Sequence, residues 1–296
     1  MVYEQIFKPN KTAFVVYPFL KKAIFRFIIL LVVLSIVQAF SIVAMLASIA
    51  AFIVLEIYAF YSALIRFKKE RYVFKEHHVV RESGGIFSNN NTQLVLKNVT
   101  QVILRKPWLE NKFYNTANIR VEAAGSGTSE ILLRSIDNSD KVYSYVEKLL
   151  QSNGFKLTKK QLVQTETPSS LGVFFETFKI FWGAFIVLAY LLIGSDGIFF
   201  HLIFGAGSLV LLLVALLVIT YLFSLALLRF LDLKARLYNV YTDAITYEEG
   251  FLTKEYSFIP IENLADSEVH QTFIDKIFGL YDVIISSQGS KNKILF

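Results

Sequence analysis

The sequence has no cysteine among its 296 residues. This absence excludes structural disulfides, thiolate metal sites, thiol nucleophiles and haem attached through thioethers. The net charge of the chain is +6, which is small for a nucleic-acid-binding protein. The sequence also has no basic-aromatic module of a known kind. We therefore expect no nucleic-acid partner.

Motifs of catalysis are missing as well: the sequence has no Ser-His-Asp arrangement, P-loop, zincin motif or G-x-G-x-x-G pattern. His77 and His78 are adjacent, and adjacent residues on a strand point to opposite faces, so they rarely bind one metal together. Gly125-Ser126-Gly127 is predicted to be a hairpin turn and not a phosphate-binding loop, because no helix follows it. We predict a non-enzymatic protein with no catalytic residues, no metal site and no cofactor.

Apolar residues, by contrast, are abundant, at 54% of the chain. They are concentrated in two blocks, which is typical of membrane spans. From Phe27 to Ile65 the only charged residue is Glu56. One helix of that length would be about twice as long as the ~30 Å hydrocarbon core, so the block predicts two spans with a turn near Gln38–Ser48.

The second apolar block runs from Phe178 to Leu228 and is broken by the turn sequence Gly194-Ser195-Asp196-Gly197. It predicts spans over about 178–193 and 199–228, hence a second transmembrane hairpin. The first twenty residues lack the features of a cleavable signal peptide.

Basic residues flank both hairpins, whereas neither turn contains Lys or Arg. They are Lys21, Lys22 and Arg26 before the first, Arg66, Lys68, Lys69 and Arg71 after it, Lys179 before the second, and Arg229, Lys234 and Arg236 after it. The positive-inside rule then predicts a multi-pass protein of the bacterial inner membrane, with its N-terminus and both polar domains in the cytoplasm.

The residues between the hairpins predict a small β domain. Short apolar runs at Gln93–Leu96, Asn118–Ala123 and Glu130–Arg134 are separated by turn residues. An amphipathic helix follows, capped by Asn138 or Ser139 and ending before Gly154, with an apolar stripe of Val142, Val146, Leu149 and Leu150. This pattern favours a barrel or sandwich closed by one helix.

The region after the second hairpin repeats this domain about 166 residues later. Arg71-Tyr72-Val73-Phe74 corresponds to Leu237-Tyr238-Asn239-Val240, Asn98-Val99 to Asn263-Leu264, Trp108 to Phe273, and Ile119–Gly125 to Val283–Gly289. A repeat of this size indicates a duplicated module. The expected domains are an N-terminal segment with hairpin one (1–66), a β domain (67–152), a linker around Thr167-Pro168 (153–172), hairpin two (173–230) and a second β domain (231–296).

The second copy stops at the strand corresponding to residues 131–133 and lacks the capping helix. Loss of a lid exposes apolar surface. We expect either that the chain is a truncated piece or that a partner completes the second domain.

A membrane hairpin leading into Arg71-Tyr72-Val73-Phe74, the glycine turns at Gly84-Gly85 and Gly250, and the Phe278-Gly279-Leu280 motif resemble the bacterial membrane-attached pleckstrin-homology-like (PH-like) family. The first copy departs from the last motif, with Phe113-Tyr114-Asn115. The resemblance implies two tandem PH-like barrels or sandwiches with a C-terminal helix, used for binding or assembly rather than catalysis.

Burying the ionisable side chain of Glu56 near the middle of a bilayer costs roughly 2.5–3.5 kcal/mol on insertion scales. If Glu56 is functional, it is expected to act as an ion or proton relay, or to bind another helix through Gln38 or a partner subunit. Otherwise its side chain is expected to be protonated or to lie closer to a membrane interface. The basic residues are either topogenic anchors or contacts to membrane and partner. These candidate contacts are Arg66, Lys68, Lys69, Arg71, Lys97, Arg105, Lys106, Trp108, Arg229, Lys234 and Arg236.

The leading hypothesis is a membrane scaffold whose cytoplasmic PH-like domains bind a protein partner, lipid headgroups or another copy of the chain. The alternative is a transporter or export component for resistance to a toxic compound, acting through Glu56 and the transmembrane helices.

Overall fold

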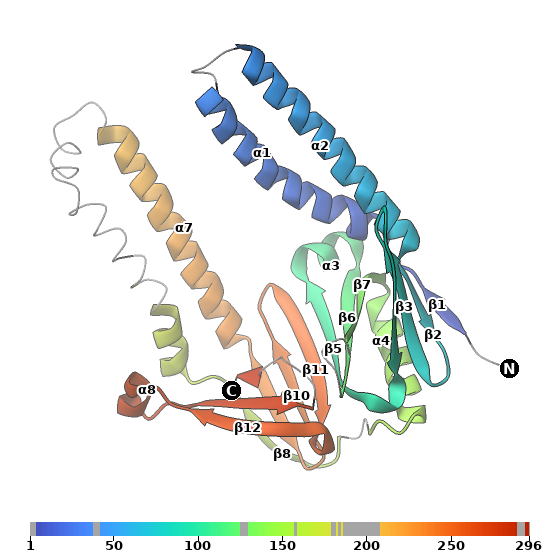
Figure 1. Cartoon of the computed structure of the whole chain (residues 1–296). Helices are drawn as coiled ribbons and strands as arrows, with labels where there is room; N and C mark the ends of the chain where they lie inside the picture. Colours follow the sequence, from blue (N-terminus) through green and yellow to red (C-terminus); the bar gives the residue numbers. More distant parts are fainter. Residues whose placement is uncertain are drawn as a thin grey trace.

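The fold comes from a computed structural model (Figure 1). It describes residues 4–37, 42–124, 130–156, 159–178, 182, 185, 208–288 and 294–295. Several sequence-based expectations lie outside the described residues: Gln38, the turn at Gly125–Gly127, Lys179, and the span and turn expected between 179 and 207.

The chain folds as two repeats whose described strands and helices follow the same order as far as β7 and β14. The first contains β1 (Gln5–Phe7), a π-helix (Thr12–Val16), α1 (Tyr17–Val37), α2 (Ile42–Lys69), β2 (Arg71–Phe74), β3 (His78–Gly84), β4 (Asn89–Val95), a 3₁₀ turn (Leu96–Asn98), β5 (Val99–Pro107), α3 (Trp108–Tyr114), β6 (Thr116–Ala123), β7 (Glu130–Asp137) and α4 (Ser139–Ser152).

The second repeat contains β8 (Leu162–Glu166), a helical segment over 170–178, α7 (Ser208–Lys234), β9 (Leu237–Tyr241), β10 (Ala244–Glu249), β11 (Thr253–Pro260), a 3₁₀ turn (Ile261–Asn263), β12 (Leu264–His270), α8 (Phe273–Phe278), β13 (Asp282–Ser287) and β14 (Ile294–Leu295). The matching order confirms the predicted internal repeat.

In the first repeat the chain forms a PH-like β-sandwich. One sheet has the order β1-β2-β3-β4, and β5, β6 and β7 belong to the facing sheet. Helix α4 lies against this core through Val142, Val146 and Leu150, as the sequence stripe predicts. Asn138 precedes α4 in a left-handed conformation, but its side chain makes no capping hydrogen bond, so the predicted cap is wrong there.

The apolar helices connect neighbouring strands of a sheet. β1 pairs with β2 across the α1–α2 hairpin, and β8 pairs with β9, the strand that follows α7. β8 lies inside the segment 153–172, which the sequence predicted to be a linker, so that segment contains a strand of the second repeat.

The two repeats share one sheet, in the order β7-β6-β5-β11-β10-β9-β8. β5 of the first repeat pairs antiparallel with β11 of the second, from Val102 opposite Phe258 to Pro107 opposite Thr253. Phe258 and Ala244 of the second repeat are buried in the core cluster of the first. The repeats are therefore joined by backbone pairing and by a common core.

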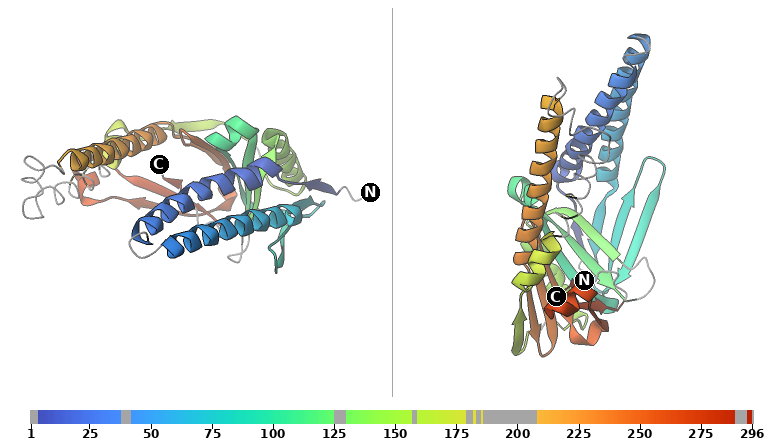
Figure 2. Two further views of the ribbon diagram at one scale, coloured as in Figure 1. Left: turned by 90° about the horizontal axis from the view of Figure 1, so that it is seen from above. Right: turned by 90° about the vertical axis from the view of Figure 1, so that its left-hand side faces the viewer.

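Helices α1, α2 and α7 extend from the β part to the same side (Figures 1 and 2). Among the described residues, α2 is the one helix long and apolar enough to cross a membrane. Helix α1 carries Lys21, Lys22 and Arg26 within its first half. The described residues thus support one apolar span, which is less than the two transmembrane hairpins that the sequence predicts.

Candidate functional site

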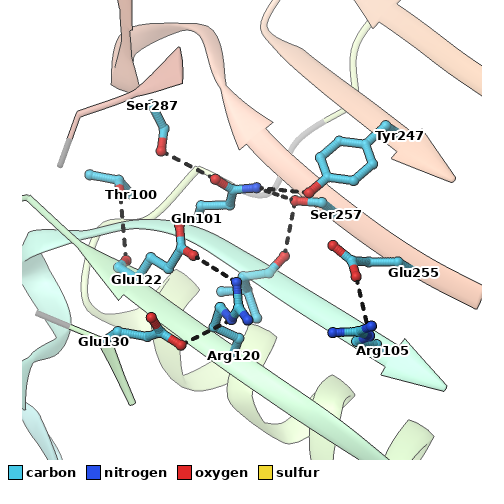
Figure 3. A network of polar contacts seen from close by, with 11 residues as sticks. Thr100, Gln101, Arg105, Arg120, Glu122, Glu130, Tyr247, Glu255, Ser257 and Ser287 are labelled. Atoms are coloured by element: carbon cyan, nitrogen blue, oxygen red, sulfur yellow. Dashed lines mark hydrogen bonds and ion pairs between the residues drawn. The ribbon is translucent and has the colours of Figure 1, made fainter. Parts of the chain in front are cut away.

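The junction between the repeats contains a buried polar cluster (Figure 3). Gln101 on β5 is fully buried. Its Nε2 donates to Ser257 Oγ at 2.7 Å and to the Tyr247 hydroxyl at 3.3 Å. Its Oε1 accepts a hydrogen bond from Ser287 Oγ at 3.2 Å. One side chain of the first repeat therefore binds three hydroxyl groups of the second.

Ion pairs flank this cluster. Arg105 on β5 lies 3.7 Å from Glu255 on β11, and Lys156 Nζ lies 2.6 Å from Glu262. Burial raises the pKa of the Glu255 carboxyl above its usual range, and the nearby Arg105 opposes this shift only in part.

A second polar cluster surrounds equivalent tyrosines at the end of each apolar helix. The Tyr72 hydroxyl donates to Glu70 at 2.9 Å, and Arg81 Nε donates to the same carboxylate at 2.7 Å. In the second repeat the Tyr238 hydroxyl donates to Glu249 at 2.9 Å, with Arg236 3.5 Å from that carboxylate. Burial raises the pKa of both tyrosines, so they stay protonated hydrogen-bond donors.

The order of the two charges is reversed between the repeats, although Glu249 lies beyond Tyr247, the residue that corresponds to Arg81 in the strand pairing. Glu70 precedes β2 and pairs with Arg81 on β3, whereas Arg236 precedes β9 and pairs with Glu249 on β10. These clusters join the end of each apolar helix to the β-domain below it.

The second repeat contains a cavity of about 670 Å³. The helical segment 170–178, the end of α7, strands β9, β10 and β13, and the α8–β13 turn line it. Its apolar floor includes Val240, Ile245, Val283 and Ile285. This volume is within the ~300–1,000 Å³ of ordinary ligand pockets.

Glu56 is paired within its own hairpin. Its two carboxylate oxygens accept hydrogen bonds from Arg26 Nε and from Arg26 Nη2, the latter at 2.7 Å. The sequence-based candidates for binding Glu56 to another helix were Gln38 or a partner subunit, whereas the structure gives Arg26 on α1. Arg26 had been predicted to flank the hairpin, but α1 begins at Tyr17 and includes it.

The predicted contact residues fall into two groups. Arg66, Lys68, Arg71 and Lys97 are exposed, and Trp108 is 46% exposed on α3. The others make contacts within the chain. Lys69 donates to the β3–β4 turn, Lys106 pairs with Asp140, Arg229 and Arg236 with Asp232, Arg105 with Glu255, and Lys234 lies over the Phe230 ring.

In the part of the chain that the structure describes, no group of three or more His, Asp or Glu is arranged to hold a metal ion. His77 is exposed in the turn before β3, 3.0 Å from Asn153, and His78 begins β3.

Sequence reasoning missed Gln101, Tyr247, Ser257 and Ser287. The available signal was Gln101 itself, a polar residue within the mainly apolar run Val99–Leu104, which is typical of a buried strand.

Together, the sheets and their repeated order define a tandem PH-like β-sandwich protein. The sequence matches the family described as Bacterial PH domain over residues 19–150 and 183–295. These segments cover most of the chain, so the chain belongs to this family, and the two segments confirm the tandem copies. No curated protein and no solved structure matches the chain.

Proposed function

We propose that this protein is a non-enzymatic scaffold of the bacterial inner membrane, whose PH-like domains bind a protein partner or lipid headgroups on the cytoplasmic side. Membership of the Bacterial PH domain family supports a binding role. The observation that carries the proposal is the joining of both repeats through β5 and β11 into one body, with their apolar helices on one side.

Membrane anchoring is supported by the surface of α2. Ile53, Val54, Leu55 and Ile57 are each more than half exposed. A soluble protein rarely exposes so large a contiguous apolar surface. Helices α1 and α7 extend to the same side of the β part as α2. The described helices therefore fit a multi-pass anchor, whose remaining spans are predicted from the sequence alone.

Charge at the base of α2 supports contact with the membrane surface. Arg66, Lys68 and Arg71 are exposed where α2 meets β2. A cation near anionic headgroups contributes about 1 kcal/mol. These three residues would hold the first domain close to the bilayer. Two domains in one tethered body also raise the effective concentration for a partner that contacts both.

The transport alternative depends on Glu56 as a relay for protons or ions. That carboxylate is held by Arg26 of the same hairpin. The contact supports a packing role for Glu56 and gives the transport hypothesis no specific observation.

Two measurements test the proposal. The chain should remain in the membrane fraction through alkaline carbonate, and release into the supernatant would contradict the anchor. Captured from bacterial membranes in mild detergent, the chain should retain a stoichiometric protein partner or an enriched anionic lipid. A chain that carries neither, and that catalyses substrate flux in vesicles, would contradict the scaffold.

A further inference from the structure

The cavity of the second repeat lies where the first repeat has packed polypeptide. With the repeat offset of about 166, Tyr238, Val240 and Ile245 of the cavity correspond to Tyr72, Phe74 and Val79. In the alignment of Ile119–Gly125 with Val283–Gly289, Ile285 corresponds to Val121. All four residues of the first repeat are buried in its core cluster. The same surface is therefore covered in one repeat and hollow in the other.

In the first repeat the cover is the end of β7 followed by α4. The backbone N–H of Arg134 donates to the Tyr72 hydroxyl at 3.0 Å. Val142, Val146 and Leu150 of α4 pack on the core, and the Tyr145 ring lies 5.9 Å from that of Phe74. The cover is thus a strand end and an amphipathic helix with an i, i+4, i+8 stripe.

In the second repeat the described strand β14 pairs with β13 only at Ile284 and Ile285. By comparison, β7 pairs with β6 as far as Asp137 opposite Thr116. Beyond Ile284, the part of β13 at Asp282 and Val283 borders the cavity. The floor that α4 covers in the first repeat is open there among the described residues.

We propose that this cavity binds an amphipathic helix of a partner polypeptide. The helix inserts an apolar stripe spaced like Val142, Val146 and Leu150, and presents basic residues beside it. The apolar requirement follows from the four equivalent floor positions. The length of α4, Ser139–Ser152, sets the scale of the helix.

The basic requirement follows from the charges that line the cavity. Four carboxylates line it, from Glu166, Glu176, Asp275 and Asp282, against two guanidinium groups, from Arg229 and Arg236. Groups of both signs have partners within the chain: the arginines pair with Asp232, Thr272 donates to Asp275, and Gln164 donates to Glu166. The lining as a whole still holds more negative than positive groups. A helix with lysines on its flanks complements this excess of negative charge.

This inference rests on the proposed binding role and names a partner for it. It does not depend on the membrane anchor. Release of the chain by carbonate would end the anchor proposal while leaving helix binding intact, so the two failures can be told apart.

The probes are three fluorescent peptides covering residues 138–154. One has the native sequence, one carries Asp140→Lys and Glu147→Lys, and one carries Val142→Ser, Val146→Ser and Leu150→Ser. Each is titrated by fluorescence anisotropy against the full chain in detergent. The native peptide should bind, the lysine peptide should bind several-fold more tightly at low salt, and the serine peptide should bind at least about tenfold more weakly than the native one.

Variants of the full chain locate the binding. Val283→Trp places a bulky ring in the cavity and should weaken the binding of the native and lysine peptides at least about tenfold. Val269→Trp is the matched control, because the same change falls on a 70% exposed residue of β12. Val240→Phe, which copies Phe74, supplies a second cavity-filling variant if Val283→Trp does not fold.

Loss of binding in the filled variants alone supports the proposal. Equal binding of the serine peptide, or unchanged binding by both filled variants, would overturn it. If neither peptide binds and a native mass spectrum shows a retained acyl-chain lipid, the cavity belongs to lipid and the proposal is also overturned.

Discussion

Glu255 is the junction residue whose ionisation should make stability depend on pH. Burial raises the pKa of its carboxyl in the folded state. A raised folded-state pKa favours the protonated form, so its stabilising contribution is present at acid pH and is lost as pH rises through that value. Glu255→Gln keeps the shape without the charge, and we expect it to raise the unfolding temperature at neutral pH.

Thermal unfolding in detergent between acid and neutral pH measures this effect. The gain from Glu255→Gln should shrink towards zero at acid pH, where the native carboxyl is protonated. Glu248→Gln, at an exposed position on the neighbouring strand β10, is the control. A Glu255→Gln chain that is less stable at neutral pH would show that the Arg105 pair outweighs the burial.

Gln101 is the residue on which the hydrogen bonds of the junction converge. Gln101→Leu preserves apolar volume but leaves the hydroxyl groups of Ser257, Tyr247 and Ser287 without this partner. A buried polar group without its partner costs ~1–3 kcal/mol, so we expect a loss of about 2 kcal/mol in the free energy of unfolding. Gln93→Leu, at an exposed position on β4, should change stability little. Equal effects in chemical denaturation would contradict the assigned role.

At the scale of elements, a charged pair joins α1 to α2 within the described residues. Glu56→Gln removes the carboxylate that holds Arg26, and hydrogen bonds to charged groups contribute ~1.5–3 kcal/mol. We expect Glu56→Gln to lower the free energy of unfolding by about that amount. Arg26→Met combined with Glu56→Met should recover most of it, because no unpaired charge remains in the hairpin.

A double-mutant cycle of Arg26→Met, Glu56→Met and the variant with both changes measures this coupling on detergent-solubilised protein. Additive losses from the two single changes would show that Arg26 and Glu56 act independently. That result would remove the packing argument against Glu56 as a relay for protons or ions.

Elements were predictable where their own pattern decides their burial. The stripe of α4 identified its buried face, and alternation along β6 identified Ile119 and Val121 as core residues. Alternation failed at Glu122, which is buried although it lies on the polar face. The sheet around β5 continues into β11 of the second repeat, and a local pattern carries no information about that distant strand.

Two further elements were missed for the same reason. β8 is exposed along its whole length and owes its existence to pairing with β9, about 75 residues away. The Arg26–Glu56 contact depends on how α1 and α2 lie against each other, which sequence spacing across an unlocated turn does not give. The cavity also required comparison of the two folded repeats.

At the scale of the whole molecule, the two repeats should unfold together. β5–β11 pairing and the common core place Phe258 of the second repeat inside the first. Phe258→Ala should cost ~3–5 kcal/mol and lower the stability of both repeats in one transition. Phe251→Ala, at a residue 45% exposed, is the control. Two separate transitions in calorimetry of the native chain would contradict the single body.

In the proposed membrane anchor, the same joining would constrain the topology of the chain. Because the repeats share a sheet, Phe87 of the first and Glu248 of the second must lie on one side of the bilayer, whichever side that is. Positive charge at the ends of the apolar blocks predicts the cytoplasmic side, with Ser195 on the other side. The chain has no cysteine, so each introduced cysteine is the sole target of a thiol reagent.

Phe87→Cys, Glu248→Cys and Ser195→Cys can therefore be labelled with a membrane-impermeant maleimide in vesicles of defined orientation. Phe87 is 96% exposed, and Glu248 is also exposed. We expect both to react only in inverted vesicles and Ser195→Cys only in right-side-out vesicles. If Phe87→Cys and Glu248→Cys react together from outside, the orientation is wrong but the joined body stands. If they react from opposite sides, the shared sheet itself is contradicted, because a continuous sheet cannot have its two halves separated by a bilayer.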